Sequence, residues 1–180
     1  LHYFRDSEAD AAPYRIADGH YGDIIRGTGG LVSYWRLGES EGSFCADARN
    51  YAPAYLYGGY TRGATGGVVN EPQVKATTFN GSTAYAVASG ANLHPGDTFT
   101  VELWFKRSTT GAAMQMWSGG ANDVEIGFSS TDLLTVRKEN VGNNFVSTAS
   151  YTDTNWHYLT VVRSPGSTSV KVDGVTVTGT

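Results

Sequence analysis

Hydrophobic and polar positions alternate most clearly between Thr98 and Arg107, which read TFTVELWFKR. A period of two, carried by aromatic and β-branched residues, predicts a β-strand whose two faces have different surroundings. Trp104 interrupts the polar side, so we expect that face to be partly covered and Trp104 to be a core residue. A strand this apolar is expected in the interior of a sheet, because an exposed edge would invite aggregation.

Short alternating segments continue from there to the C-terminus, spaced at roughly ten residues with turn residues between them. They read AMQMWSGG, DVEIGF, LLTVRKE, NFVSTAS, NWHYLTVVR, SVKVDG and VTVT. Two dipeptides predict hairpins, Asn80-Gly81 and Asp173-Gly174. Trp156, in the NWHYLTVVR segment, is expected to be a second core tryptophan. The pattern as a whole predicts an all-β antiparallel sandwich with no long helix.

The first thirty residues differ from the rest because they show no sustained period, and Pro13 argues against a helix through them. YGDIIRG, from Tyr21, predicts one or two helical turns that end at the following glycines. We therefore expect an irregular N-terminal arm over residues 1–30, with at most a short helix, and a sandwich over 31–180 whose first strand is LVSYWRLG. The arm leans on the sandwich or on a neighbouring chain, or it is a flexible terminus.

Composition supports this fold class and excludes some partners. Only 17% of the 180 residues are charged, and there are 23 glycines and 11 tyrosines, as expected for a β fold with many tight turns. A net charge of −4 provides no basic face for nucleic acid. No segment is long and apolar enough for membrane insertion. The first residue is Leu1 rather than methionine, which suggests processing or a fragment.

Four tyrosines lie within ten residues of one another. They are Tyr51, Tyr55, Tyr57 and Tyr60. Such a cluster has two interpretations, a platform that stacks against sugar rings or sandwich residues whose polar tips reach the surface.

Several segments together resemble a known family. In order they are LVSYWRLGE, TTFNGSTAYAVA, DTFTVELWFKR, NWHYLTVVR and VKVDG. From about residue 21 to 180 the chain resembles the laminin-G-like domains of the concanavalin A-like lectin/glucanase superfamily, in the versions found in bacterial surface and phage virion proteins. The resemblance implies a jelly roll of two antiparallel sheets. It also implies further strands after the VDG hairpin, so we expect C-terminal strands to be missing and a sheet edge to be open.

The enzymes of that superfamily carry a Glu-x-Asp-x-Glu motif, in which alternation places three carboxylates on one face of a strand. The nearest match here runs from Ala121 to Glu125, with Asp123 in the middle. Because Ala121 stands at the nucleophile position, no covalent glycosyl-enzyme intermediate can form there. The sequence therefore predicts a protein that is not an enzyme.

The same region contains the candidate binding residues. Asn122, Asp123 and Glu125 offer the oxygen ligands that calcium prefers, beside a glycine-rich turn. Calcium is thus a possible cofactor, and no other is expected. Trp117 precedes that turn, where it either stacks on a sugar ring or belongs to the core. Trp117, Asn122 and Asp123 are the predicted ligand-binding set, whereas His157 is expected to be packed or hydrogen-bonded rather than a metal ligand.

These observations favour a non-catalytic, lectin-like adhesion module, extracellular or on a virion surface, that recognises a glycan. One alternative is a structural phage tail, fibre or capsid-decoration protein. A weaker one is an accessory domain of a carbohydrate-active enzyme. The expected partners are protein neighbours in a larger assembly and a surface glycan, with neither nucleic acid nor membrane insertion.

Overall fold

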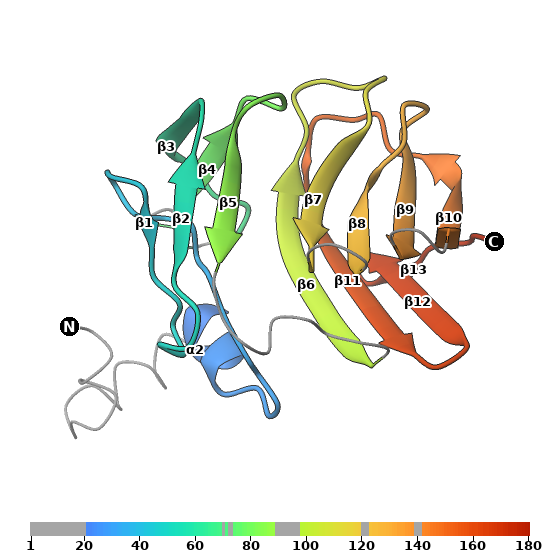
Figure 1. Cartoon of the computed structure of the whole chain (residues 1–180), viewed down its shortest axis with the longest axis horizontal. Helices are drawn as coiled ribbons and strands as arrows, with labels where there is room; N and C mark the ends of the chain where they lie inside the picture. Colours follow the sequence, from blue (N-terminus) through green and yellow to red (C-terminus); the bar gives the residue numbers. More distant parts are fainter. Residues whose placement is uncertain (1–20, 70, 72–73, 89–97, 120–122, 139–141) are drawn as a thin grey trace. The chain divides into compact units, whose positions relative to one another are not determined.

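The computed structural model describes residues 21–69, 71, 74–88, 98–119, 123–138 and 142–180. The fold is an all-β antiparallel sandwich, as the sequence predicts (Figure 1). The chain divides into two compact units, Leu1–Gly90 and Ala91–Thr180, which are described separately. The predicted boundary after residue 30 stays a prediction, and the first twenty residues of the arm lie outside the described residues.

The second unit contains two four-stranded antiparallel sheets. One has the order β13-β12-β11-β6 and the other β10-β9-β8-β7. The strands of the first sheet are β6 (Phe99–Lys106), β11 (Trp156–Ser164), β12 (Ser167–Val172) and β13 (Val175–Thr176). Those of the second are β7 (Met114–Ser118), β8 (Val124–Phe128), β9 (Leu133–Lys138) and β10 (Gly142–Ser150).

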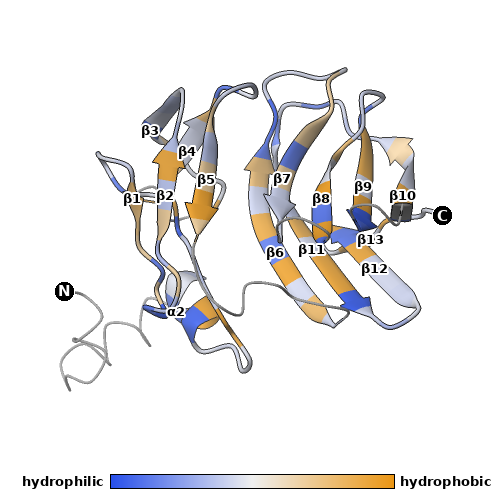
Figure 2. Ribbon diagram, in the orientation of Figure 1, coloured by the Kyte–Doolittle hydropathy of each residue, from blue (hydrophilic) through white to orange (hydrophobic). Residues whose placement is uncertain are grey.

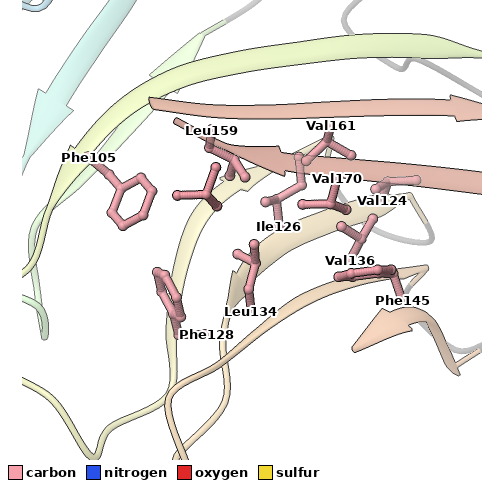
Figure 3. Packing of buried hydrophobic residues seen from close by; sticks show 11 residues of the cluster. Phe105, Val124, Ile126, Phe128, Leu134, Val136, Phe145, Leu159, Val161 and Val170 are labelled. Atoms are coloured by element: carbon pink, nitrogen blue, oxygen red, sulfur yellow. The ribbon is translucent and has the colours of Figure 1, made fainter. Parts of the chain in front are cut away.

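Side chains from both sheets fill the space between them. In Figure 3, Leu159, Val161 and Val170 point toward Ile126 and Leu134 of the facing sheet. Figure 2 shows the hydrophobic residues recurring along β6, β8 and β11, as the alternation predicts. The fully buried members are Val124, Ile126, Leu134, Val136, Leu159 and Val161, each 0% exposed.

The position of β6 differs from the prediction. β6 lies at the edge of its sheet, and within the described part of the chain it pairs only with β11. Alternation reports which faces of a strand are covered, but it does not report whether both edges are hydrogen-bonded. The exposed positions of β6 include the charged residues Glu102 and Lys106.

The two predicted core tryptophans are only half-buried. Trp104 lies on the face of β6 opposite Phe105, and its ring packs against Tyr158 on β11 at 5.1 Å between centroids. The prediction of a core position was therefore wrong for Trp104, which is half-buried and is not among the residues of the core cluster. Trp156, at the start of β11, is not among the buried residues of the core.

The C-terminal residues cross from one sheet to the other. Val177 donates to the carbonyl of Val170 in the first sheet. Two residues later, Gly179 pairs with Ser147 of β10, and the backbones of Thr180 and Val146 exchange two hydrogen bonds of 2.8 and 3.0 Å. This crossing joins the two sheets along the β10 and β13 side.

One of the two predicted hairpins is confirmed. Asp173 and Gly174 have φ of 52° and 79°, as a two-residue turn between β12 and β13 requires. Asn80-Gly81 does not form a hairpin, because the strands beside it pair in different sheets. The Asn80 side chain accepts hydrogen bonds from the backbone of Ser82, Thr83 and Ala84, which makes a longer connection than a two-residue turn.

The first unit is built from short elements. They are α2 (Tyr21–Arg26), β1 (Phe44–Cys45), β2 (Ala54–Tyr57), β3 (Tyr60–Thr65), β4 (Lys75–Phe79) and β5 (Tyr85–Ala88). β1, β2 and β5 form one sheet in that order, and β3 pairs with β4. The short helix is the one the sequence predicts. Among the described residues, no helix is long and apolar enough to cross a membrane.

The predicted strand from Leu31 does not form. In this segment the N–H of Tyr34 donates to the side chain of Asp47, and Leu37 has a positive φ of 54°. Asp47 accepts backbone hydrogen bonds from Tyr34, Arg49, Tyr51 and Ala52. Burial alone would raise the pKa of Asp47, but the N–H groups of Tyr34, Arg49 and Ala52 lower it below its ordinary value. Trp35 forms an isolated bridge with Asp47 in place of a ladder.

Candidate functional site

The predicted site at the β7–β8 turn is only partly described. Asn122 and Ala121 lie outside the described residues. Trp117, on β7, is half-buried, and its ring stacks against Phe99 at 6.3 Å between centroids as part of the core rim. That is the core position anticipated as the alternative, and a role for Trp117 in ligand binding stays a prediction.

Asp123 and Glu125 are both buried, at 7% and 8% exposure. Asp123 accepts a hydrogen bond from the N–H of Val124 at 2.7 Å. Glu125 lies on the outer face of β8, where it forms an ion pair with Arg137 and accepts a hydrogen bond from Gln115. These contacts occupy Glu125 with protein partners. Calcium binding by Asn122, Asp123 and Glu125 stays a prediction. In the described part of the chain, no three His, Cys, Asp or Glu side chains are placed so that they could together hold a metal ion.

A cavity of about 450 Å³ lies at another end of the second unit, within the usual range for small-ligand sites. Its wall comes from the segment after β10, from the start of β11 and from the β12–β13 turn. Its lining residues include Tyr151, Asp153, His157, Asp173 and Val175. Serine and threonine add hydroxyl groups and three valines add apolar surface, so the lining is mixed.

His157 joins the two sides of this cavity. Its Nδ1 lies 2.7 Å from Oδ2 of Asp173, and its Nε2 lies 2.9 and 3.1 Å from the two oxygens of Asp153. Both ring nitrogens therefore face carboxylates, which accept but do not donate. An imidazolium, with both nitrogens protonated, satisfies this arrangement, and a neutral ring would leave one lone pair against a carboxylate.

The local sequence explains why these groups converge. Asp173 occupies the tight turn after β12, where its Oδ1 also accepts from the N–H of Tyr158 at 2.8 Å. Asp153 accepts from the N–H of Asn155, which fixes the segment before β11. His157 is paired in register with Phe105 and packs against its ring at 5.4 Å. Backbone N–H groups thus orient both carboxylates, and the Phe105 ring packs against the imidazole.

The charges in this cluster shift the pKa values in a consistent direction. Burial alone would lower the pKa of His157, but the hydrogen bonds to Asp173 and Asp153 raise it above its ordinary value. The pKa of Asp153 is lowered by the N–H of Asn155 and then by His157. At Asp173, burial alone would raise the pKa, but hydrogen bonds from the N–H of Tyr158 and from His157 lower it below its ordinary value.

This arrangement predicts a pH-dependent stability. A histidine whose pKa is raised on folding contributes stability that is fully present below its unfolded pKa of about 6.5 and is lost as the pH rises through the folded value. We expect the melting temperature of the wild type to fall between pH 6 and pH 8.5, and His157→Gln to remove that part of the fall. Thermal unfolding followed by circular dichroism at both pH values tests this. An equal fall in the variant would show that the bridge contributes nothing.

A family model described as concanavalin A-like lectin/glucanases superfamily, of the laminin G type, matches residues 80–180, more than half of the chain. The chain belongs to this superfamily. Searches of curated proteins and of solved structures found no match to the chain.

Membership in the concanavalin A-like lectin/glucanases superfamily points to a carbohydrate-binding or adhesion-type module. Sequence reasoning identified His157 as a hydrogen-bonded residue but did not identify the cavity around it. The available signals were Asp153, four residues before His157, and the Asp173-Gly174 turn, which follows the neighbouring strand β12. Placing both beside one imidazole required the register of β11 with β12.

Proposed function

We propose that this protein is a non-catalytic, lectin-like binding module, extracellular or on a virion surface, and that its cavity around His157 takes a glycan. One observation carries the proposal: two carboxylates are held in fixed orientation by a single imidazole at the wall of the cavity. Their side chains are 48% and 49% exposed for Asp153 and Asp173. Both therefore remain accessible to a ligand.

These carboxylates retain acceptor capacity. A carboxylate offers about four acceptor positions, and Asp173 uses one with His157 and one with the N–H of Tyr158. Sugar hydroxyls can donate to the remaining positions, while Tyr151 and the 71% exposed Val175 offer apolar contact for the C–H groups of the ring. Prepositioned acceptors beside apolar surface are what specific sugar recognition needs.

Asp153→Asn tests the proposal on a glycan array, followed by titration calorimetry with the best ligand. The amide keeps the shape of Asp153 and can still accept from His157, but it removes one charged acceptor. We expect binding to weaken on the order of tenfold, since a hydrogen bond to a charged group contributes about 1.5 to 3 kcal/mol.

Glu102→Gln is the matched control, because it removes the same charge from the exposed outer face of β6. The control should bind like the wild type. Absence of binding to every glycan on the array would refute the proposal. So would hydrolysis of laminarin that Glu125→Gln abolishes, because that result would identify an enzyme despite Ala121.

A second candidate function is structural, within a phage tail, fibre or other larger assembly. The observation that favours it is the edge strand β6, eight residues long, whose only pairing partner in the described part of the chain is β11. Such an edge accepts a strand from a neighbouring protein. Concentration-dependent association in sedimentation, with β6 amides gaining hydrogen-exchange protection, supports this role. A monomer at high concentration contradicts it.

A further inference from the structure

One face of the β1-β2-β5 sheet carries large exposed side chains, which we call the aromatic face. Its members are Phe44, Tyr55, Tyr57, Tyr85 and Val87, and each is 43–55% exposed. They share a face because the register places Phe44, Tyr55 and Val87 in one row across the strands and Tyr57 beside Tyr85 in the next. On the opposite face, Cys45, Ala54 and Leu56 of β1 and β2 are 0–3% exposed, whereas Ala86 of β5 is exposed.

The rings of the aromatic face are arranged in two pairs. Tyr57 and Tyr85 stack with centroids 5.2 Å apart and planes 18° apart. Phe44 and Tyr55 meet edge to face at 5.6 Å. Each pair fixes the rings of its row, and the two rows are about 7 Å apart, since they are two residues apart along a strand. The face is therefore a preformed platform with two aromatic contact points.

Charge restricts what this platform can bind. β1, β2 and β5 read FC, AYLY and YAVA and contain no charged residue. An anionic polymer would find no cation on these strands to pair with, and a cationic one would find no carboxylate. The ligand that fits is uncharged, with flat apolar surfaces for the rings and hydroxyls for the three tyrosine tips.

The area of the face argues against a second protein chain. An aromatic side chain presents about 150–250 Å², so five side chains that are half exposed offer on the order of 400–500 Å². A stable protein–protein interface buries about 800 Å² on each partner. The aromatic face is too small for such an interface, but it suffices for two consecutive sugar residues.

We infer that the aromatic face binds an uncharged, extended polysaccharide, with successive sugar rings resting on the two rows of side chains. This inference extends the proposed glycan-binding function to a second site, in the first unit, with its own ligand class. Of the four tyrosines that cluster in the sequence, only Tyr55 and Tyr57 belong to the aromatic face. Tyr51 lies outside the sheet, Tyr60 begins β3 and packs against the buried side, and Phe44, Tyr85 and Val87 come from elsewhere in the sequence.

The full chain is tested for depletion from solution by microcrystalline cellulose and by chitin beads, with alginate beads as the anionic comparison. The wild type should bind an uncharged polymer and not alginate. The double variant Tyr55→Ala/Tyr57→Ala should lose at least tenfold in affinity. Tyr51→Ala, an exposed tyrosine outside the sheet, is the matched control and should bind like the wild type. Circular dichroism confirms that the variants are folded, and Tyr57→Phe, which keeps the ring, should retain binding.

The outcomes separate this inference from the proposed function. If Asp153→Asn weakens glycan binding on the array and the aromatic variants bind cellulose or chitin like the wild type, the cavity site stands and the aromatic face is refuted. If the wild type binds neither uncharged polymer, the inference is refuted whatever the array shows. A dimer in sedimentation that Tyr55→Ala/Tyr57→Ala dissociates also refutes it, because the occupant is then a second copy of the chain. Loss of polymer binding only in the aromatic variants supports it even if Asp153→Asn has no effect.

Discussion

Replacing Leu159 by alanine should reduce the free energy of unfolding by about 3 to 4 kcal/mol. Leu159 is 0% exposed and lies on β11, between Leu103 of β6 and Val172 of β12. The side chains of the facing sheet close over it in Figure 3. Removing three carbon atoms here loses their transfer free energy and leaves a cavity that two hydrogen-bonded sheets cannot collapse to fill.

Val162→Ala on the same strand is the control, because Val162 points to the outer face and is 44% exposed. It should change the free energy of unfolding by less than about 0.5 kcal/mol. Urea denaturation of both variants, followed by tryptophan fluorescence, measures the difference. Equal losses at the two positions would mean that the alternation along β11 has been assigned to the wrong faces.

The alternation in the sequence was sufficient to predict this part of the molecule. Leu159 and Val161 are buried, and Val162 is not, as period-two reasoning on NWHYLTVVR requires. The Asp173-Gly174 turn was also predictable, because its positive φ angles depend on local residue types. The alternation and the turn depend only on residues that are close together in the chain, so they can be predicted from a single sequence.

Features that depend on distant partners were not predictable in this way. Asn80-Gly81 has the dipeptide of a hairpin, yet the strands beside it pair with different neighbours. The edge position of β6 and the half-buried Trp104 follow from which strands lie beside them, which alternation does not report. In the same way, the sequence indicated Tyr55 and Tyr57 but not that Phe44 and Tyr85 lie on the same face.

The candidate site also combines residues that the local sequence indicates with residues that only the strand pairing brings together. Asp123 and Glu125 were predicted as calcium ligands because their carboxylates lie near a glycine-rich turn, but Glu125 is engaged by Arg137 and Gln115. The cavity residues Asp153, His157 and Asp173 match no motif. They come together because the β11–β12 pairing brings the turn after Val172 beside the start of β11. Only the register of the sheet shows that arrangement.

Arg107→Met should destabilise the second unit by about 3 kcal/mol, because it removes one partner of a buried ion pair. Arg107 directly follows β6, and its side chain is 2% exposed. One nitrogen lies 2.7 Å from Oδ1 of Asp132, another donates to the carbonyl of Tyr151 at 2.7 Å, and the guanidinium lies 4.2 Å from the centroid of the Phe128 ring. The side chain thus joins β6 to the two segments at one end of the facing sheet's β9–β10 pair, just before Leu133 and just after Ser150. Methionine can replace only its apolar contact with Phe128.

The pH dependence distinguishes loss of this ion pair from simple loss of packing. The N–H of Gly111 and the Arg107 guanidinium lower the pKa of Asp132, so the contribution of Asp132 is present above its unfolded pKa of about 4 and is lost as the pH falls through its folded value. Arg107→Met should therefore lose less stability than the wild type between pH 6 and pH 3 in urea denaturation. Lys106→Met, which removes an exposed positive charge from the neighbouring position, should behave like the wild type at both pH values. An Arg107→Met variant with wild-type stability at pH 6 would mean that water satisfies Asp132 and the Tyr151 carbonyl, and that Arg107 does not hold these turns together.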